Sequence, residues 1–244
     1  DSYLDSVMAK AYVEGFQGDD LSNPNSLVAC AKHYVAYGGA EGGRDYNTVD
    51  ISERTLRDVY LPPFKAAVKA GCGTLMSAFN DLNGVPAAAN KFALMDILRG
   101  EWGFEGFVVS DWNSVAELIN HGVAADPAEA VKEAFEAGVD MDMFSNLYQT
   151  YLAQLVKEGK VSQEHLDAAV RRILGIKFKL GLFEHPYADP ERAVKVVKCK
   201  EHLALALQAA RESIVLLTNR CNLLPLKKDL KSVAVIGPLA NNRE

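Results

Sequence analysis

The feature that most constrains the fold of this chain is a regular alternation of short apolar runs with segments of helical periodicity. The apolar runs are "SLVACAKHYV" (26–35), "CGTLMSAF" (72–79), "GFVVSDW" (106–112) and "VDMDM" (139–143). Helical patterns occupy 1–16, 52–71, 91–102, 126–138, 147–158 and 162–180. Repeated strand–helix alternation predicts βα units and a parallel sheet. Runs that are apolar nearly throughout indicate strands covered on both faces.

Two parallel-sheet architectures fit this alternation, a closed barrel and an open doubly wound sheet. Neither GxGxxG nor GxxxxGK[ST] follows a strand, so the usual nucleotide cradle is absent. Long polar segments follow the strands instead, as at 36–47 and 111–122. Decorated loops on one rim are typical of barrel enzymes. We therefore expect residues 1–181 to form the second, C-terminal half of a (β/α)8 TIM-type barrel, because four units make half of eight.

The character of the sequence changes after Gly181. Residues 182–231 contain a proline-bearing linker, an apolar-striped helix and a strand pattern, and "SVAVIG" begins a new strand pattern at 232. We expect 182–231 to connect the barrel to a second domain, an α/β sandwich, whose first elements occupy 232–244. The chain begins at Asp1 and closes soon after a lone strand pattern, and a half barrel leaves unpaired edges. We therefore expect a fragment, cut at both ends.

Composition and charge exclude several classes of function. Among 244 residues the net charge is −6 and no basic tract occurs, which argues against nucleic acid as a partner. No apolar run approaches the roughly 20 residues of a membrane helix. The four cysteines have neither CxxC spacing nor a histidine at metal-ligand spacing. We expect no metal, no cofactor and no membrane span.

Polar and aromatic residues follow the predicted strands, where side chains on a parallel barrel point into the site. These positions are Lys32 and His33, Met76 to Phe79, Asp111 and Trp112, and Asp140 to Met143. A cation, an imidazole, carboxylates and flat rings suit a neutral polyol such as a sugar. Structural alternatives stay open, because an aspartate after a strand often caps a helix and Trp112 can simply cover the rim. The pattern indicates a barrel enzyme with an acidic site.

Several longer stretches resemble glycoside hydrolase family three. They are "AKHYVAYGG", "GGRDYNTVDISERTLRDVYLPPFKAAVKAG", "NGVPAAAN", "LMDILRGEWGFEGFVVSDW" and "AGVDMDM", with "ESIVLLTNRCNLLPLKK" and "VAVIGP" matching the passage into that family's second domain. The resemblance covers essentially the whole chain, in order. It implies an exo-acting hydrolase that retains configuration, most similar to bacterial periplasmic β-glucosidases, and a periplasmic or secreted location with a signal peptide upstream. The implied substrate is a β-linked oligosaccharide or glucoside.

The resemblance also implies roles for individual residues. Asp111 in "SDW" matches the nucleophile. The residues matching sugar contacts are Lys32, His33, Arg44, Met76, Phe79 and Trp112. Phe79 stands where many relatives have tyrosine, so the hydroxyl that would support Asp111 is missing.

A retaining glycosidase needs a second carboxyl group as acid and base. In the family this group is a glutamate on the second domain, which implies a position beyond residue 244 and a fragment that is inactive alone. The candidates within the chain are Glu41, Asp45, Asp81, Asp140 and Asp142, of which the last two are interpreted as structural strand-end residues.

Two other functions remain open, and a third is disfavoured. A β-xylosidase or arabinofuranosidase of the same family and a noncatalytic sugar-binding remnant remain alternatives. An N-acetylglucosaminidase is disfavoured, because "KHYVAYGG" lacks the second histidine of that subfamily's segment.

Overall fold

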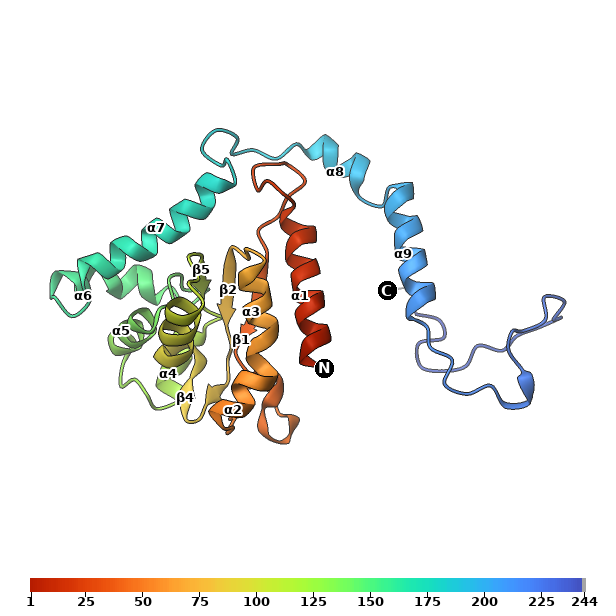
Figure 1. Cartoon of the computed structure of the whole chain (residues 1–244), viewed down its shortest axis with the longest axis horizontal. Coiled ribbons are helices and arrows are strands. Elements are labelled where there is room, and N and C mark those ends of the chain that lie inside the picture. The colour runs from red at the N-terminus through yellow and green to blue at the C-terminus, as the bar shows by residue number, and fades with distance from the viewer. Residues whose placement is uncertain (243–244) are drawn as a thin grey trace. The chain divides into compact units, whose positions relative to one another are not determined.

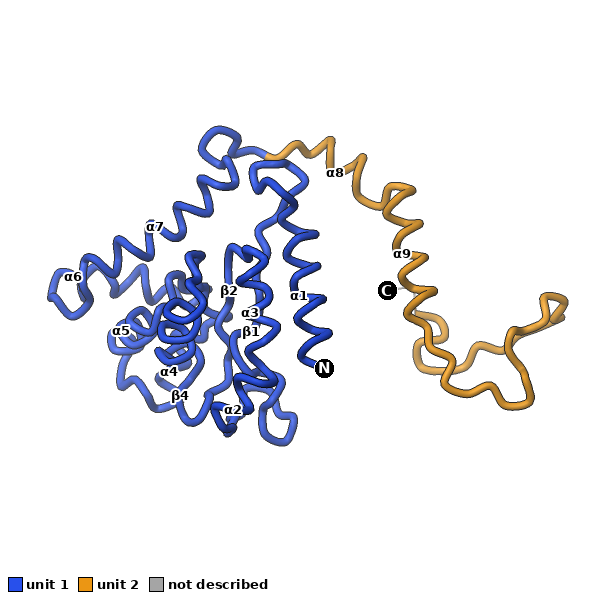
Figure 2. The backbone as a smooth tube through the Cα atoms, in the orientation of Figure 1, with its two compact units in different colours: residues 1–187 blue, residues 188–244 orange. Residues whose placement is uncertain are grey.

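The structure, a computed structural model, describes residues 1–242 and contains two compact units. Residues 1–187 form the first unit and the second begins at Ala188 (Figure 2). The hydrophobic clusters belong to the first unit. The second contains the helices α8 (Pro190–Val196) and α9 (Lys200–Ser213). The predicted division at residues 181 and 231 stays a prediction.

A parallel sheet organises the first unit (Figure 1). Its strands are β1 (Cys30–Tyr34), β2 (Thr74–Ser77) and β5 (Phe107–Val109), and they lie side by side in chain order. Leu75 pairs with Ala31 on one side and Val108 on the other, and both pairings are parallel. The predicted α/β class with a parallel sheet is confirmed.

The fourth predicted strand, at 139–143, is reduced to one parallel bridge between Met141 and Val109. The carbonyl of Val108 accepts from the backbone N–H groups of both Asp140, at 2.8 Å, and Met141, at 3.1 Å. Beyond this point the Asp142 carboxylate accepts from the backbone N–H of Leu147 at 2.9 Å and turns the chain into a helix. The strand expected over 139–143 is therefore wrong in its length. Only Met141 of this segment pairs with β5.

Helices pack against the sheet, and α1 lies alongside α3 next to β1 (Figure 1). The α-helices of the first unit are α1 (Ser2–Gln17), α2 (Glu53–Thr55), α3 (Leu61–Lys69), α4 (Ser114–Asn120), α5 (Pro127–Ala137), α6 (Ala153–Lys157) and α7 (Gln163–Lys179). Wider helical turns occupy Leu56–Tyr60, Phe92–Glu101 and Tyr148–Leu152. Leu75 and Val108 of the sheet are fully buried and pack in one cluster with apolar side chains of these helices. Burial of this apolar surface stabilises the first unit.

Local signals determine the ends of α5. Asp126 accepts from the backbone N–H of Glu129 at 2.9 Å, and Pro127 occupies the first turn. The Glu129 carboxylate accepts in return from the backbone N–H of Ala125 at 2.6 Å. Gly138 ends the helix in the left-handed conformation at φ 107°. The predicted start at Asp126 and end at Gly138 are both confirmed.

The loop after β2 contains a small antiparallel hairpin. Its strands are β3 (Asp81–Leu82) and β4 (Val85–Pro86), joined by Asn83 and Gly84, which both have positive φ. An Asn-Gly pair is the usual signal for such a turn.

The apolar segment at 232–236 forms no strand in the part of the chain that is described. Val233, Val235 and Ile236 are exposed there, at 65%, 72% and 91%. An isolated strand is unstable without a hydrogen-bonded neighbour. Across residues 1–242, no helix is long and apolar enough to cross a bilayer.

Gly106 allows the segment that leads into β5 to approach the backbone at Gly73 closely. A Cβ atom at this position would lie 2.1 Å from the carbonyl oxygen of Gly73 and 2.6 Å from the ring of Phe104. Both distances are far shorter than a van der Waals contact. Only glycine therefore fits at the start of this strand.

A buried carboxylate ties β5 to two helices. Asp140 accepts from the Arg99 guanidinium at 2.6 Å through Oδ2 and from that of Arg172 at 2.6 Å through Oδ1. Asp140 Oδ2 also accepts from the backbone N–H of Val108 at 2.9 Å. The Asp140 side chain is 1% exposed, so its charge is neutralised without water. This contact supports the structural interpretation of Asp140.

We predict that Asp140→Asn lowers the free energy of unfolding by about 3–5 kcal/mol, because breaking a buried ion pair leaves uncompensated charge. Urea unfolding measures the change. The matched control is Asp50→Asn, at an exposed position. A change at Asp140 no larger than that of the control would contradict the structural role.

Candidate active site

Asp111 lies two residues beyond the end of β5, and hydrogen bonds fix its backbone. The Ser110 backbone N–H donates to the carbonyl of Met141 at 2.8 Å. The Ser110 hydroxyl donates to the carbonyl of Asp111 at 2.9 Å and accepts from the backbone N–H of Met143 at 2.8 Å. The end of β5 and segment 141–143 therefore hold Asp111 between them.

The Asp111 carboxylate is nearly buried, but only one of its two oxygens accepts a hydrogen bond. The residue is 7% exposed, and its Oδ1 accepts from the backbone N–H of Trp112 at 2.7 Å. Its Oδ2 is buried and has no hydrogen-bond partner among the described residues. An unpaired buried carboxylate oxygen is unfavourable and therefore unusual in a folded protein. Such an oxygen is available to a ligand.

The basic side chain that lies near Asp111 Oδ2 in the described chain is that of His33, although the contact is not a hydrogen bond. Its Nε2 lies 3.4 Å from Asp111 Oδ2. Burial, followed by the charge of neighbouring Lys32, lowers the pKa of His33, while Asp111 and Asp45 act in the opposite direction. The imidazole is therefore neutral at neutral pH. It can donate one hydrogen bond to a hydroxyl-rich ligand and accept one from it.

An aromatic cluster lies beside His33, and Tyr37 of the loop after β1 contacts the imidazole directly. The Tyr37 ring lies edge-on to the imidazole at 5.4 Å, and its hydroxyl donates to Asp45. Phe79 packs against Tyr46 at 4.5 Å and Tyr37 at 6.0 Å between ring centroids. Phe79 was expected here from the sequence, whereas the two tyrosines were not. Their position in a glycine-rich loop directly after a strand was the available signal.

The remaining predicted contacts are distributed around the same rim. Lys32 is exposed on β1, and Met76 is half-buried on β2 at the position paired with Val109. Arg44 is exposed in the loop after β1, and its guanidinium makes no ion pair with residues 1–242. Neither Lys32 nor Arg44 forms an ion pair with Asp111 in the described chain, where the basic group close to its carboxylate is His33.

Trp112 forms the other side of the candidate site. Its ring stacks on that of Phe144, with centroids 4.1 Å apart and planes inclined by 18°. Trp112 is 55% exposed and Phe144 is 58% exposed. Phe144 was not expected here from the sequence, because nothing in its local pattern links it to Trp112.

Most of the other candidate carboxylates have structural partners. Asp81 accepts from the Thr48 hydroxyl at 2.7 Å, and Asp142 accepts from the Ser145 hydroxyl at 2.6 Å. Asp45 accepts from Tyr37, and Glu41 is exposed. Glu117, on α4, was not considered from sequence. Burial raises its pKa, and the charge of Asp111 adds to this effect despite the opposing charge of His121.

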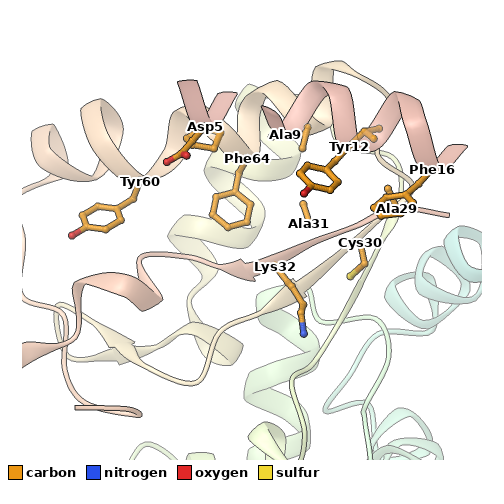
Figure 3. Close-up of a pocket in the computed structure, with 13 residues that line it drawn as sticks. Asp5, Ala9, Tyr12, Phe16, Ala29, Cys30, Ala31, Lys32, Tyr60 and Phe64 are labelled. Atoms are coloured by element: carbon orange, nitrogen blue, oxygen red, sulfur yellow. The ribbon is translucent and has the colours of Figure 1, made fainter. Parts of the chain in front are cut away.

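A cavity of about 450 Å³ lies at the free side of β1, next to α1 and α3. Figure 3 shows Tyr12 and Phe16 of α1 and Phe64 of α3 above the strand, with Cys30 and Lys32 pointing away from these helices. Its lining is largely apolar and excludes Asp111. Of the predicted site residues, the cavity shares only Lys32. Within residues 1–242, no cluster of His, Cys, Asp or Glu side chains could hold a metal ion.

Comparison with known proteins identifies a match over most of the chain. The family model described as "Glycosyl hydrolase family 3 N terminal domain" matches residues 1–176. A periplasmic beta-glucosidase of Salmonella typhimurium is 46% identical over 248 residues, covering 100% of this chain and 32% of the relative. A putative beta-xylosidase of Formosa agariphila is 40% identical, covering 99% of this chain and 33% of the relative.

Solved structures give the same result. A beta-glucosidase from Listeria innocua in complex with glucose superposes with a TM-score of 0.89 at 46% identity, covering 93% of this chain and 32% of that chain. A mutant of it in complex with laminaribiose gives a TM-score of 0.90, with the same identity and coverage. The chain thus spans about a third of the length of the relatives it matches. The architecture matches part of their barrel domain.

We predict that the His33 imidazole titrates below its usual pKa of about 6.5 and that Lys32→Met raises that value. NMR titration of the ring protons measures both, with Lys91→Met as an exposed-lysine control. Because the fold favours neutral His33, its contribution to stability is complete above the unfolded pKa. That contribution is lost as the pH falls through the folded pKa. An unchanged pKa in Lys32→Met would exclude the electrostatic coupling.

Proposed function

The chain belongs to glycosyl hydrolase family 3, and from this membership we propose that the protein is an exo-acting β-glycoside hydrolase that releases terminal β-linked glucose with retention of configuration. The observation that carries the proposal is the buried, unpaired Oδ2 of Asp111 at the end of β5. The relatives named beta-glucosidase and the complexes with glucose and laminaribiose support glucose as the released sugar.

In the proposed mechanism Asp111 is the nucleophile. Its Oδ2 attacks the anomeric carbon as the bond from that carbon to the leaving-group oxygen breaks, and a second carboxyl group protonates the departing oxygen. Water, deprotonated by the same carboxyl group, then cleaves the glycosyl–Asp111 ester. The backbone hydrogen bonds around Ser110 keep the attacking oxygen in place, as attack geometry requires.

The other rim residues are assigned to substrate binding. Lys32, His33 and Arg44 hydrogen-bond the hydroxyls of the sugar to be released. Met76, Phe79 and Trp112 contact its apolar surfaces. In support, neutral His33 is 3.4 Å from Asp111, and Phe79 is packed in the same aromatic cluster.

The second carboxyl group is assigned to a glutamate in sequence beyond residue 244. In support, Asp81, Asp140 and Asp142 have structural partners within the chain. The rest of the protein would also extend the sheet at the free edge of β1 and supply the second domain. A periplasmic or secreted location is proposed from the relative named periplasmic beta-glucosidase.

A β-xylosidase is the alternative that a specific observation favours, since relatives at 40% and 41% identity are named beta-xylosidases. Comparing p-nitrophenyl β-glucoside with the corresponding β-xyloside separates the two, because xylose lacks the hydroxymethyl group.

We predict that Asp111→Asn in the full-length protein lowers turnover by several orders of magnitude while glucose still binds, because the amide cannot form the ester. Incubation of the parent protein with a 2-fluoro-glucoside should add one glycosyl mass to the peptide containing Asp111. The control Asp96→Asn changes an exposed carboxylate. Parent-like turnover in Asp111→Asn would reject the assignment, and a sugar-binding remnant would give no adduct.

We also predict that the 244-residue chain alone hydrolyses cellobiose far more slowly than the full-length protein. Without the proposed acid the leaving oxygen departs unprotonated, and general acid catalysis contributes about 10²–10⁴-fold. An activated aryl glucoside needs less protonation and should be affected less. Equal turnover of cellobiose would place the acid within this chain, and Asp45 and Asp142 would then be replaced first.

A further inference from the structure

Another cavity near the candidate site is lined by polar side chains. It has a volume of about 210 Å³ and is formed by Tyr46 of the loop after β1 and by Glu117, Asn120 and His121 of α4 and its C-terminal end. The lining combines a phenol, a carboxylate, an amide and an imidazole, all of which can hydrogen-bond a ligand. We call this cavity the polar pocket. It differs in chemistry from the largely apolar cavity beside α1.

Both segments that form the polar pocket are connected to the candidate site. The Tyr46 ring packs on Phe79 with centroids 4.5 Å apart, and Phe79 belongs to the aromatic cluster beside His33. The helix α4 begins three residues after Asp111 and carries Glu117 in its first turn. The polar pocket therefore borders the segments that hold His33 and Asp111.

The Glu117 carboxylate lacks partners that would compensate for its burial. The residue is partly buried, yet its carboxylate forms no hydrogen bond or ion pair with residues 1–242. Burial raises the pKa of Glu117, and the charge of Asp111 adds to this effect against that of His121. Asp111 is thus close enough to act on Glu117 electrostatically. A carboxylate that has lost hydration without gaining a partner is unfavourable, and a ligand that donates hydrogen bonds would compensate for this loss.

Tyr46 also has an unfavourable conformation. Its φ is 64°, in the left-handed region that bulky residues rarely adopt. The residue is 49% exposed, so burial offsets little of the cost. Residues held in such conformations are concentrated at functional sites. Each of the two segments that form the polar pocket therefore contains a residue whose placement does not favour stability.

The composition and size of the polar pocket favour a single sugar ring. A carboxylate can accept from two neighbouring hydroxyls, and an amide can both donate and accept, so the lining matches a polyol. An anion would be repelled by Glu117 and by nearby Asp111. No cluster of side chains in the described part of the chain fits a metal ion. The volume is smaller than the roughly 300–1,000 Å³ of a typical ligand site, which leaves room for one ring but not for a longer chain.

We propose that Tyr46, Glu117, Asn120 and His121 bind the hydroxyls of the sugar unit that forms the leaving group of an oligosaccharide substrate. This inference rests on the proposed function, in which the released sugar covers Asp111 and the leaving group lies beyond it. Glu117 supplies the strongest contact, because hydrogen bonds to a charged group are stronger than those between neutral groups. Substrates whose leaving group is a sugar should therefore depend on Glu117, and those with a small alkyl leaving group should not.

The test compares three variants of the full-length protein. Glu117→Gln keeps the shape of the side chain but removes its charge, and Asn120→Ala removes the amide from an exposed helical position. Glu105→Gln is the matched control, because Glu105 is an exposed glutamate outside the polar pocket. Methyl β-glucoside is compared with the disaccharide that the parent hydrolyses faster, cellobiose or laminaribiose, since only a disaccharide has a sugar as its leaving group.

For the disaccharide, kcat/KM should fall about 5–30-fold in Glu117→Gln, from loss of a charged hydrogen bond, and about 2–10-fold in Asn120→Ala. For methyl β-glucoside both variants should change kcat/KM less than twofold. Glu105→Gln should affect neither substrate. If Glu117 acted only on the charge of Asp111, both substrates would be affected equally. That result, or no loss with the disaccharide, would overturn the proposal.

Binding without turnover separates this inference from the proposed function. Calorimetric titration uses glucose and the same disaccharide with sulfur in place of the oxygen between its sugars, which is cleaved slowly. In Glu117→Gln the thio-disaccharide should bind about 5–30-fold more weakly while glucose binding is unchanged. This result would support the polar pocket even in a protein that hydrolyses nothing. Equal weakening of both ligands, unchanged binding of the thio-disaccharide, or no binding of it to the parent would reject the proposal.

Discussion

The position of Asp111 depends on the buried carboxylate of Asp140, which bonds to β5 from 32 residues further along the chain. Asp140 bonds the backbone N–H of Val108 and two guanidinium groups, so it joins β5 to the helical segment Phe92–Glu101 and to α7. Arg99 extends this contact, because its Nη1 donates at 3.1 Å to the carbonyls of both Phe104 and Gly106. The turn before β5 and the strand itself are therefore fixed by one ionic cluster. Buried ion pairs contribute little net stability compared with apolar packing, but they strongly disfavour other arrangements of the same charges.

Much of the fold can be predicted from the sequence where the signals are local. The ends of α5 follow from Asp126, Pro127 and Gly138, because capping acts within a few residues. The three strands follow from apolar runs bounded by helical patterns. The length of the fourth strand could not be predicted, because "VDMDM" reads as a strand until the partners of Asp140 and Asp142 are known. Those partners, Arg172 and Leu147 among them, lie on other elements.

The candidate site was predictable to a similar extent. The position of Asp111 follows from its place after a buried strand, and its assignment as nucleophile remains a proposal. The surroundings of Asp111 were harder to anticipate, because they depend on loops whose paths are not periodic. Tyr37 and Tyr46 reach the site through a glycine-rich loop, and Phe144 reaches Trp112 from a separate segment. No pattern in one stretch of sequence encodes such a contact.

We call the buried residues beneath Asp111 the floor of the site and the residues at its open edge the rim. The two parts differ in burial and in backbone conformation. Below Asp111 the residues are buried, paired and in ordinary conformations, as Val108 and Asp140 illustrate. At the rim Asn113 and Phe144 have positive φ, and the rings of Trp112 and Phe144 are exposed. A rigid floor is required because the geometry of attack tolerates little displacement. The rim contacts the variable part of a substrate, so it can differ between relatives without moving Asp111. Strain at the rim is tolerated because the ionic cluster and the apolar core fix the floor independently.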